Sequence, residues 1–186
     1  MNIAVFASGS GSNAQKIFEH FEQHSTVKVA LLVCNKAEAY VIERAKQFGI
    51  PVLIVDKKSF NDEVFLLSVL KQHKIEFIVL AGFLWLIPAY LIKAYPDKMV
   101  NIHPALLPKY GGKGMHGMHV HQAVHENKEK ESGITIHYVN EVYDSGKIVF
   151  QTTCKVEGLQ PDDIAKEVLK LEHRHFPEVI EKLLLK

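Results

Sequence analysis

The chain of 186 residues lacks several features that would mark a particular class of protein. Its only cysteines, Cys34 and Cys154, are too few for a disulfide-rich scaffold, and each stands in or beside an apolar run, as reduced thiols of cytoplasmic proteins do. No apolar stretch is long enough to cross a membrane, and the opening MNIAVFASGS has no signal-peptide pattern. We therefore expect a soluble cytoplasmic domain with no membrane partner.

An excess of charge of one sign is also missing. The chain has 22 Lys and Arg residues against 21 Asp and Glu residues, a net charge of +1, and no block of like charges. Because a nucleic-acid binder shows a basic patch or stripe, we expect no nucleic-acid partner. The 47% hydrophobic content over this length is enough for a core that needs no disulfide or metal staple.

The apolar residues are arranged as strands that alternate with helices. Short apolar runs at residues 3–7, 27–33, 52–55, 77–81 and 99–102 are typical of buried strands, and apolar residues at helical spacing lie between them. This alternation predicts a largely parallel sheet with right-handed crossovers. Residues 133–139 and 148–156 predict an antiparallel strand pair toward the C-terminus. With no repeat or linker, we expect a single domain over residues 1–186.

Local signals predict where three helices begin or end. Ser12 with Gln15 is a capping-box pattern for the first helix, and Ser59 with Asp62 gives a start for the third. Pro177 predicts that the last helix kinks or breaks after Phe176.

A glycine-rich loop at residues 8–13 joins the first strand to the first helix. Backbone N–H groups at a helix N-terminus favour an anion. Gly9, Gly11 and Ala14 also fit the dinucleotide fingerprint G-x-G-x-x-A. The residues after the second strand are Asn35 and Lys36, however, where a dinucleotide site has an acidic residue that binds the ribose. We therefore favour a phosphate monoester over a dinucleotide. A tight turn without a ligand is the alternative.

Asn101 and His103 alternate with apolar residues at the end of a strand. A period of two places both polar side chains on the same side, and Pro104 keeps His103 extended. Strand ends of open α/β sheets are where sites are built. The alternative, two side chains that hydrogen-bond a turn, is equally good from these residues alone.

Other segments have both a functional and a structural interpretation. Residues 82–88 are an aromatic-rich loop that suits either a pocket wall or core packing, and residues 109–121 are a glycine-rich candidate lid. Asp144 before Ser-Gly is ordinary turn chemistry, and His137 projects with Thr135 toward solvent or a site. The histidines at 116, 119, 121 and 125 match no zinc signature, so we expect no metal.

Together these motifs resemble the folate-dependent formyltransferases, and within them the branch that formylates glycinamide ribonucleotide. The resemblance is carried by SGSGSN at residues 8–13, AGFL at 81–84 and NIHPALLPKY at 101–110, and by Asp144 with Gly146. Glu172-His173 and Pro177 also belong to it. The motifs follow the family's order over nearly the whole chain.

The resemblance implies a three-layer, Rossmann-like α/β formyltransferase fold and a specific reaction. A formyl group passes from 10-formyltetrahydrofolate, the co-substrate, to the amine of 5'-phosphoribosylglycinamide in purine (IMP) biosynthesis. The family's catalytic residues correspond to Asn101, His103 and Asp144, with His137 and Thr135 as possible supports. Phosphate and ribose contacts fall on Gly11, Ser12, Asn13 and Glu172. The implied folate-binding residues are Leu84, Trp85, Leu86, Ile87, Asn101, Val139, Asn140 and Glu141.

Departures and alternatives accompany the resemblance. Trp85 stands where the family often has an arginine, and a second family arginine has no counterpart near residues 61–64. Two alternatives are a formyltetrahydrofolate hydrolase and a tRNA-directed formyltransferase, and both of these relatives carry an additional domain. A third alternative is a non-enzymatic nucleotide-binding module. We expect small-molecule substrates as partners and a monomer or weak homodimer.

Formyl transfer also gives the three residues a chemical task. The Asn101 amide and a His103 imidazolium suit a tetrahedral oxyanion, and Asp144 is expected to raise the pKa of His103 and to take the proton that the amine loses.

Overall fold

The computed structural model describes residues 1–185, which form two compact units. The first unit is Met1–Val100, and the second begins at Asn101. The strand β5 (Met99–His103) starts in the first unit and ends in the second. The expectation of one domain over the whole chain stays a prediction.

The first unit is a parallel sheet with helices between its strands. Its strands are β1 (Asn2–Ala7), β2 (Lys28–Cys34), β3 (Val52–Ile54) and β4 (Ile75–Leu80), in the order β3-β2-β1-β4. The helices are α1 (Ser12–Phe21), α2 (Val41–Gln47), α3 (Lys57–Asn61), α4 (Glu63–Gln72) and α5 (Ala89–Ala94). The residues of β1 from Ile3 to Ala7 are fully buried, as a central parallel strand covered on both faces requires. The predicted parallel sheet is confirmed.

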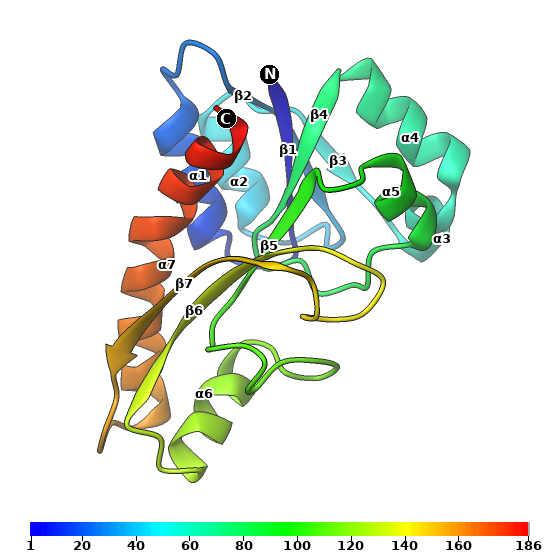
Figure 1. Ribbon diagram of the computed structural model, residues 1–186. Helices are drawn as coiled ribbons and strands as arrows, with labels where there is room; N and C mark the ends of the chain where they lie inside the picture. The colour runs from blue at the N-terminus through cyan, green and yellow to red at the C-terminus, as the bar shows by residue number, and fades with distance from the viewer. Residues whose placement is uncertain (186) are drawn as a thin grey trace. The chain divides into compact units, whose positions relative to one another are not determined.

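The second unit contains an antiparallel pair and the longest helix. Its elements after β5 are α6 (Met118–Glu126), β6 (Glu131–Tyr138), β7 (Ile148–Lys155) and α7 (Pro161–Leu184). The strands β6 and β7 pair antiparallel from Glu131 opposite Lys155, with a register shift between Ile136 and His137, and lie side by side in Figure 1. The predicted antiparallel pair is confirmed, and the mostly parallel sheet with flanking helices is the Rossmann-like fold that the sequence indicated.

Two local predictions of helix starts are wrong. The helix α1 begins at Ser12 itself, so Gly11 is the N-cap and no side chain caps the helix. The predicted third helix is two helices, because Asp56 caps α3 in a capping box with Ser59 and Asp62 then caps α4 by accepting from the Phe65 N–H at 2.9 Å. The extended backbone of Asp62 separates the two helices.

The last helix does not break at Pro177. The helix α7 runs from Pro161 to Leu184 with Pro177 inside it. Phe176, Val179 and Ile180 around the proline are all buried, and this burial outweighs the one backbone hydrogen bond that a proline removes. Among residues 1–185, no helix has both the length and the apolar composition needed to cross a membrane.

Candidate active site

The glycine-rich loop at residues 8–13 is held by the end of β4 and by α2, both in the first unit. The Ser8 N–H donates to the Gly82 carbonyl at 3.1 Å, and the Ser8 hydroxyl accepts from the Leu84 N–H at 3.0 Å. Gly11 has a left-handed backbone (φ 73°), and a Cβ there would lie 2.3 Å from Cγ2 of Val41. Only glycine satisfies both constraints.

This loop presents backbone donors. The carbonyl of Gly11 accepts from the Gln15 N–H at 2.8 Å, the first hydrogen bond of α1. Within residues 1–185, the backbone N–H groups of Gly11 and Ser12 donate to no carbonyl or side chain. Donors of this kind at the start of a ten-residue helix suit a phosphate, as the sequence predicted.

A second group of polar side chains gathers in the second unit, which we call the Asn101 cluster: Asn101, His103, His137 and Asp144. The two carboxylate oxygens of Asp144 divide their contacts between the histidines. Oδ2 lies 3.5 Å from Nδ1 of His103, and Oδ1 lies 3.5 Å from Nε2 of His137. The Asn101 amide nitrogen lies 3.1 Å from Nε2 of His137 and 3.5 Å from Oδ1 of Asp144. The prediction that His103 and Asp144 lie close in space is confirmed.

Backbone carbonyls determine which nitrogens of the two imidazoles carry protons. Nε2 of His103 lies 2.7 Å from the Tyr110 carbonyl, and Nδ1 of His137 lies 2.9 Å from the Tyr138 carbonyl. A carbonyl only accepts, so both of these nitrogens donate. The proton that His103 can gain or lose therefore sits on Nδ1, the nitrogen that faces Asp144.

Burial is the largest influence on the pKa of His103, and the raising effect of Asp144 that the sequence predicted comes next. Burial lowers the pKa of His103 below its ordinary value, and this outweighs the raising effects of Asp144 and of the Tyr110 carbonyl, while His137 lowers it further. The side chain of His103 is 4% exposed, so its charged form loses most of its hydration. Asp144 acts in the direction expected, but burial is the larger cause.

Asp144 remains ionised at neutral pH. Burial alone would raise its pKa, but His137, the His103 charge and the Gly112 N–H together lower it below the ordinary value. The Gly112 N–H donates to Oδ2 at 2.9 Å. Asp144 has a left-handed backbone (φ 53°), which is uncommon outside glycine.

The two residues predicted as supports have different positions. His137 is a member of the Asn101 cluster, and the structure brings it to both Asn101 and Asp144. Thr135 instead holds the chain that follows β5. Its hydroxyl donates to the Ala105 carbonyl at 2.6 Å and accepts from the Leu107 N–H at 3.0 Å and from Nε2 of Gln151 at 2.8 Å.

Sequence reasoning missed the backbone partners of this cluster. The carbonyl of Tyr110 and the N–H of Gly112 contact His103 and Asp144, yet backbone groups leave no residue-type signal. The glycine at 111 is one indirect signal, because a Cβ there would lie 2.5 Å from Cδ2 of Leu107 and 3.2 Å from Cβ of Asp144. His121 was also missed as a site neighbour. It is buried, and both burial and the charge of His103 lower its pKa.

The residues predicted to contact folate differ in exposure. Leu84 and Leu86 are 43% and 45% exposed, as a ligand-binding wall requires, whereas Ile87 is 4% exposed and belongs to the core. Val139 is half-buried and Glu141 is exposed. Asn140 shapes the loop before Asp144, because its Oδ1 accepts from the Val142 N–H at 3.1 Å and from the Ser145 hydroxyl at 2.9 Å.

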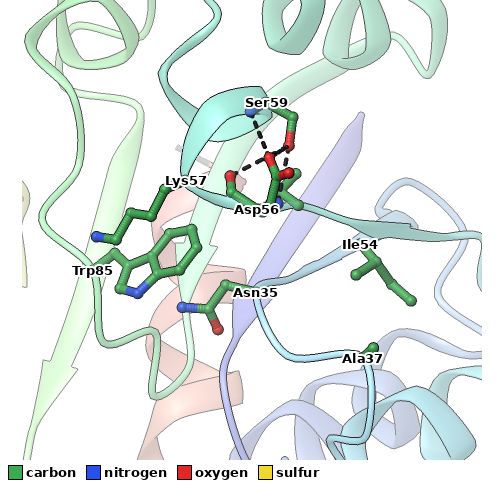
Figure 2. A pocket seen from close by; sticks show the side chains of 8 residues that line it. Asn35, Ala37, Ile54, Asp56, Lys57, Ser59 and Trp85 are labelled. Atoms are coloured by element: carbon green, nitrogen blue, oxygen red, sulfur yellow. Dashed lines mark hydrogen bonds between the residues drawn. The ribbon is translucent and has the colours of Figure 1, made fainter.

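Trp85 lies on the wall of a cavity of about 500 Å³ in the first unit (Figure 2). The Lys57 ammonium is 4.1 Å from the centre of its indole ring, and Phe60 and Phe83 pack against the same indole. The cavity is at the carboxyl ends of β2 and β3, where open α/β sheets bind ligands. The residues that line it are Asn35, Ala37, Ile54, Val55, Asp56, Lys57, Ser59 and Trp85.

The structure assigns the remaining predicted residues to the two units. Gly11, Ser12 and Asn13 are in the first unit, and Glu172 is a buried acid of α7 in the second. No group of three or more His, Cys, Asp or Glu side chains within residues 1–185 is arranged to hold a metal ion.

Comparisons with known proteins show the family of this chain. The family model described as Formyl transferase matches residues 1–180. The chain belongs to the formyl transferase family. A phosphoribosylglycinamide formyltransferase of Bacillus subtilis is 40% identical over 97% of this chain and 93% of its own length. A chloroplastic phosphoribosylglycinamide formyltransferase of Arabidopsis thaliana is 44% identical over 96% of this chain, which spans 63% of that relative.

A solved structure shows the same fold. The crystal structure of phosphoribosylglycinamide formyltransferase from Bacillus halodurans matches with a TM-score of 0.90 and 36% identity. The match covers 100% of this chain and 96% of that one. The formyl transferase fold predicted from the sequence is therefore confirmed.

Proposed function

We propose that this formyl transferase moves the formyl group of 10-formyltetrahydrofolate to the amine of glycinamide ribonucleotide, giving the N-formyl product and tetrahydrofolate in purine biosynthesis. The observation that carries the proposal is the Asn101 cluster, in which a buried imidazole faces an ionised carboxylate at 3.5 Å beside an amide donor. Relatives named for this reaction match nearly the whole chain.

In this reaction the protein must stabilise an oxyanion, transfer protons and bind the two substrates. The substrate amine attacks the formyl carbon, and the carbonyl oxygen becomes an oxyanion. One Asn101 N–H is engaged by His137 at 3.1 Å, and the other has only the long 3.5 Å contact to Asp144, so it can donate to that oxyanion. Removing one such donor typically costs about 3–4 kcal/mol of transition-state stabilisation.

His103 and Asp144 handle the protons. Because burial lowers the pKa of His103, the imidazole is mostly neutral before the reaction. The negative charge of the oxyanion that develops nearby then stabilises the protonated imidazole. Through water, the Asp144 carboxylate accepts the proton that the amine loses and passes it to Nδ1 of His103, where the carboxylate stabilises the resulting cation. Collapse of the tetrahedral centre then breaks the bond to N10 of the folate, N10 takes that proton from His103, and both side chains return to their starting states.

The other predicted residues bind the two substrates. Gly11, Ser12 and Asn13 would hold the phosphate and Glu172 the ribose. Leu84, Trp85 and Leu86 with the loop of Val139, Asn140 and Glu141 would hold the folate, and Ile87 would support this wall from the core. We further propose a cytoplasmic enzyme, a monomer or weak homodimer with one domain, that uses no metal.

A spectrophotometric assay of tetrahydrofolate release tests the proposal. We expect release only when glycinamide ribonucleotide is present, and a large loss of turnover in His103→Ala with nucleotide binding retained. His73→Ala, a half-buried histidine at the end of α4, is the matched control and should keep full activity. Formate release without an acceptor would instead identify a hydrolase, and nucleotide binding without turnover a binding module.

A further inference from the structure

The first turn of α2 contacts three successive residues, Gly9, Ser10 and Gly11, of the glycine-rich loop at residues 8–13, which we call the phosphate loop after its proposed role. The Val41 N–H donates to the Gly9 carbonyl at 3.2 Å, and Nε of Arg44 donates to the Ser10 carbonyl at 2.8 Å. The side chain of Val41 packs so closely on Gly11 that no Cβ fits there. Since Val41 and Arg44 are one helical turn apart, they reach the loop from the same face of α2.

These contacts determine where the loop's N–H groups point. In a planar trans peptide, the carbonyl of one residue and the N–H of the next point in opposite directions. With the Gly9 and Ser10 carbonyls bonded to α2, the N–H groups of Ser10 and Gly11 point away from α2. The Gly11 carbonyl is bonded into α1, so the Ser12 N–H points out of the helix end.

Arg44 is itself held in place. Its guanidinium carbon lies 4.8 Å from the centre of the Tyr40 ring, a cation–π distance, and the side chain is half-buried. A lysine at this position keeps the positive charge but has no Nε–H on a planar group to donate to Ser10. The contact therefore depends on the guanidinium and not on charge alone.

We propose that Arg44 is a positioning residue of the phosphate loop, which turns the Ser10 carbonyl toward α2 so that the Gly11 N–H faces the phosphate of a bound monoester. This inference rests on the proposed function for the identity of the acceptor. It goes beyond that function because it assigns a role to a residue outside the loop. Arg44 touches the loop and not the reacting atoms.

The kinetic test separates positioning from catalysis and from charge. In Arg44→Gln and Arg44→Lys we expect KM for glycinamide ribonucleotide to rise about tenfold, the effect of roughly one lost hydrogen bond to a charged group, with kcat within about twofold. The KM for the acceptor that lacks the phosphate, glycinamide riboside, should not change. Lys46→Gln is the control, because it removes a positive charge from the same helix without touching the loop.

Three outcomes would overturn the proposal: an unchanged KM in Arg44→Gln, full rescue by Arg44→Lys, or an equal rise for both acceptors. Thermal melting of each variant checks that the fold is intact, and Tyr40→Phe, which keeps the ring, should behave as wild type.

A binding test stands apart from formyl transfer. Inorganic phosphate is titrated into wild type and Arg44→Lys while the backbone amide signals of Gly11 and Ser12 are followed by NMR. We expect both signals to shift in wild type and a weaker affinity in the variant. Equal affinities would refute the role of Arg44 even in an active enzyme, whereas phosphate binding without formyl transfer would refute only the proposed reaction.

Discussion

The phosphate loop at residues 8–13 and the Asn101 cluster are built in opposite ways. The loop offers backbone N–H groups, contains no titratable side chain, and is held by hydrogen bonds to Gly82, Leu84 and α2. The cluster consists of side chains that are far apart in the sequence: Asn101 lies 36 positions from His137 and 43 positions from Asp144. It contains two buried histidines around one ionised carboxylate. The first suits binding of a fixed anion, and the second suits chemistry in which charge moves.

The largest expected effect comes from removing the carboxylate of the cluster. Asp144→Asn keeps the size of the side chain but removes the charge that His103 faces at 3.5 Å. We expect kcat to fall by about 10²–10⁴, the usual contribution of a general acid–base group, with KM for the nucleotide within a few-fold. Steady-state kinetics with both substrates measures this. Near-normal turnover would show that the cluster is structural.

Gly11→Ala is the corresponding change in the loop. The new Cβ would meet Val41 at 2.3 Å in a left-handed backbone, so we expect about 2–4 kcal/mol of lost stability from strain and overpacking together. Nucleotide KM should rise more than kcat falls. Urea unfolding and kinetics at a temperature where the variant is folded measure the two effects. Gly9→Ala is the matched control, because a Cβ at Gly9 meets nothing within 4 Å.

Thr135→Val tests the scaffold of the cluster. The substitution keeps the shape and removes a hydroxyl with three hydrogen bonds, which leaves the Leu107 N–H and the Ala105 carbonyl unpaired in a buried site. We expect a loss of about 2–3 kcal/mol in the free energy of unfolding. Thr153→Val, on the exposed side of β7, should change it by less than about 0.5 kcal/mol. Similar losses for both would contradict this assignment.

The smallest expected effect concerns pH. Burial, and then the His103 charge, lower the pKa of His121, whose Nδ1 is buried without a hydrogen-bond partner among residues 1–185. Below about pH 6.5, His121 binds a proton more readily in the unfolded chain than in the folded chain. The free energy of unfolding therefore falls by at most about 1.4 kcal/mol per pH unit from His121 as pH falls.

In His121→Phe we therefore expect a shallower fall of the free energy of unfolding between pH 6.5 and 5. Urea titrations at several pH values measure it, with His73→Phe as the control. An unchanged slope would contradict the assignment. Phosphate binding by the loop, which has no titratable side chain, should follow the ionisation of the phosphate alone in both variants.

Part of this architecture could be read from residue types. Five apolar runs separated by helical patterns predicted the parallel sheet because a strand buried on both faces needs continuous apolar residues. The pattern of Gly9, Gly11 and Ala14 predicted the loop, and at Gly11 the left-handed backbone and the close approach of Val41 both favour glycine. The helix starts at Asp56 and Asp62 were harder to predict because neighbouring caps compete. The continuation of α7 through Pro177 was harder because burial can outweigh a lost hydrogen bond.

Residue types were enough to predict the alternation of strands and helices, the glycine loop and the candidate residues Asn101, His103 and Asp144. Periodicity and backbone constraints act over a few residues, and the family motifs are written in residue types. Contacts between residues far apart in the sequence place His137 in the cluster and bring the Tyr110 carbonyl and the Gly112 N–H to it. Such a contact also joins Nε of Arg44 to the Ser10 carbonyl of the loop. The structure also shows that burial lowers the pKa of His103 by more than Asp144 raises it, and burial depends on everything packed around a side chain.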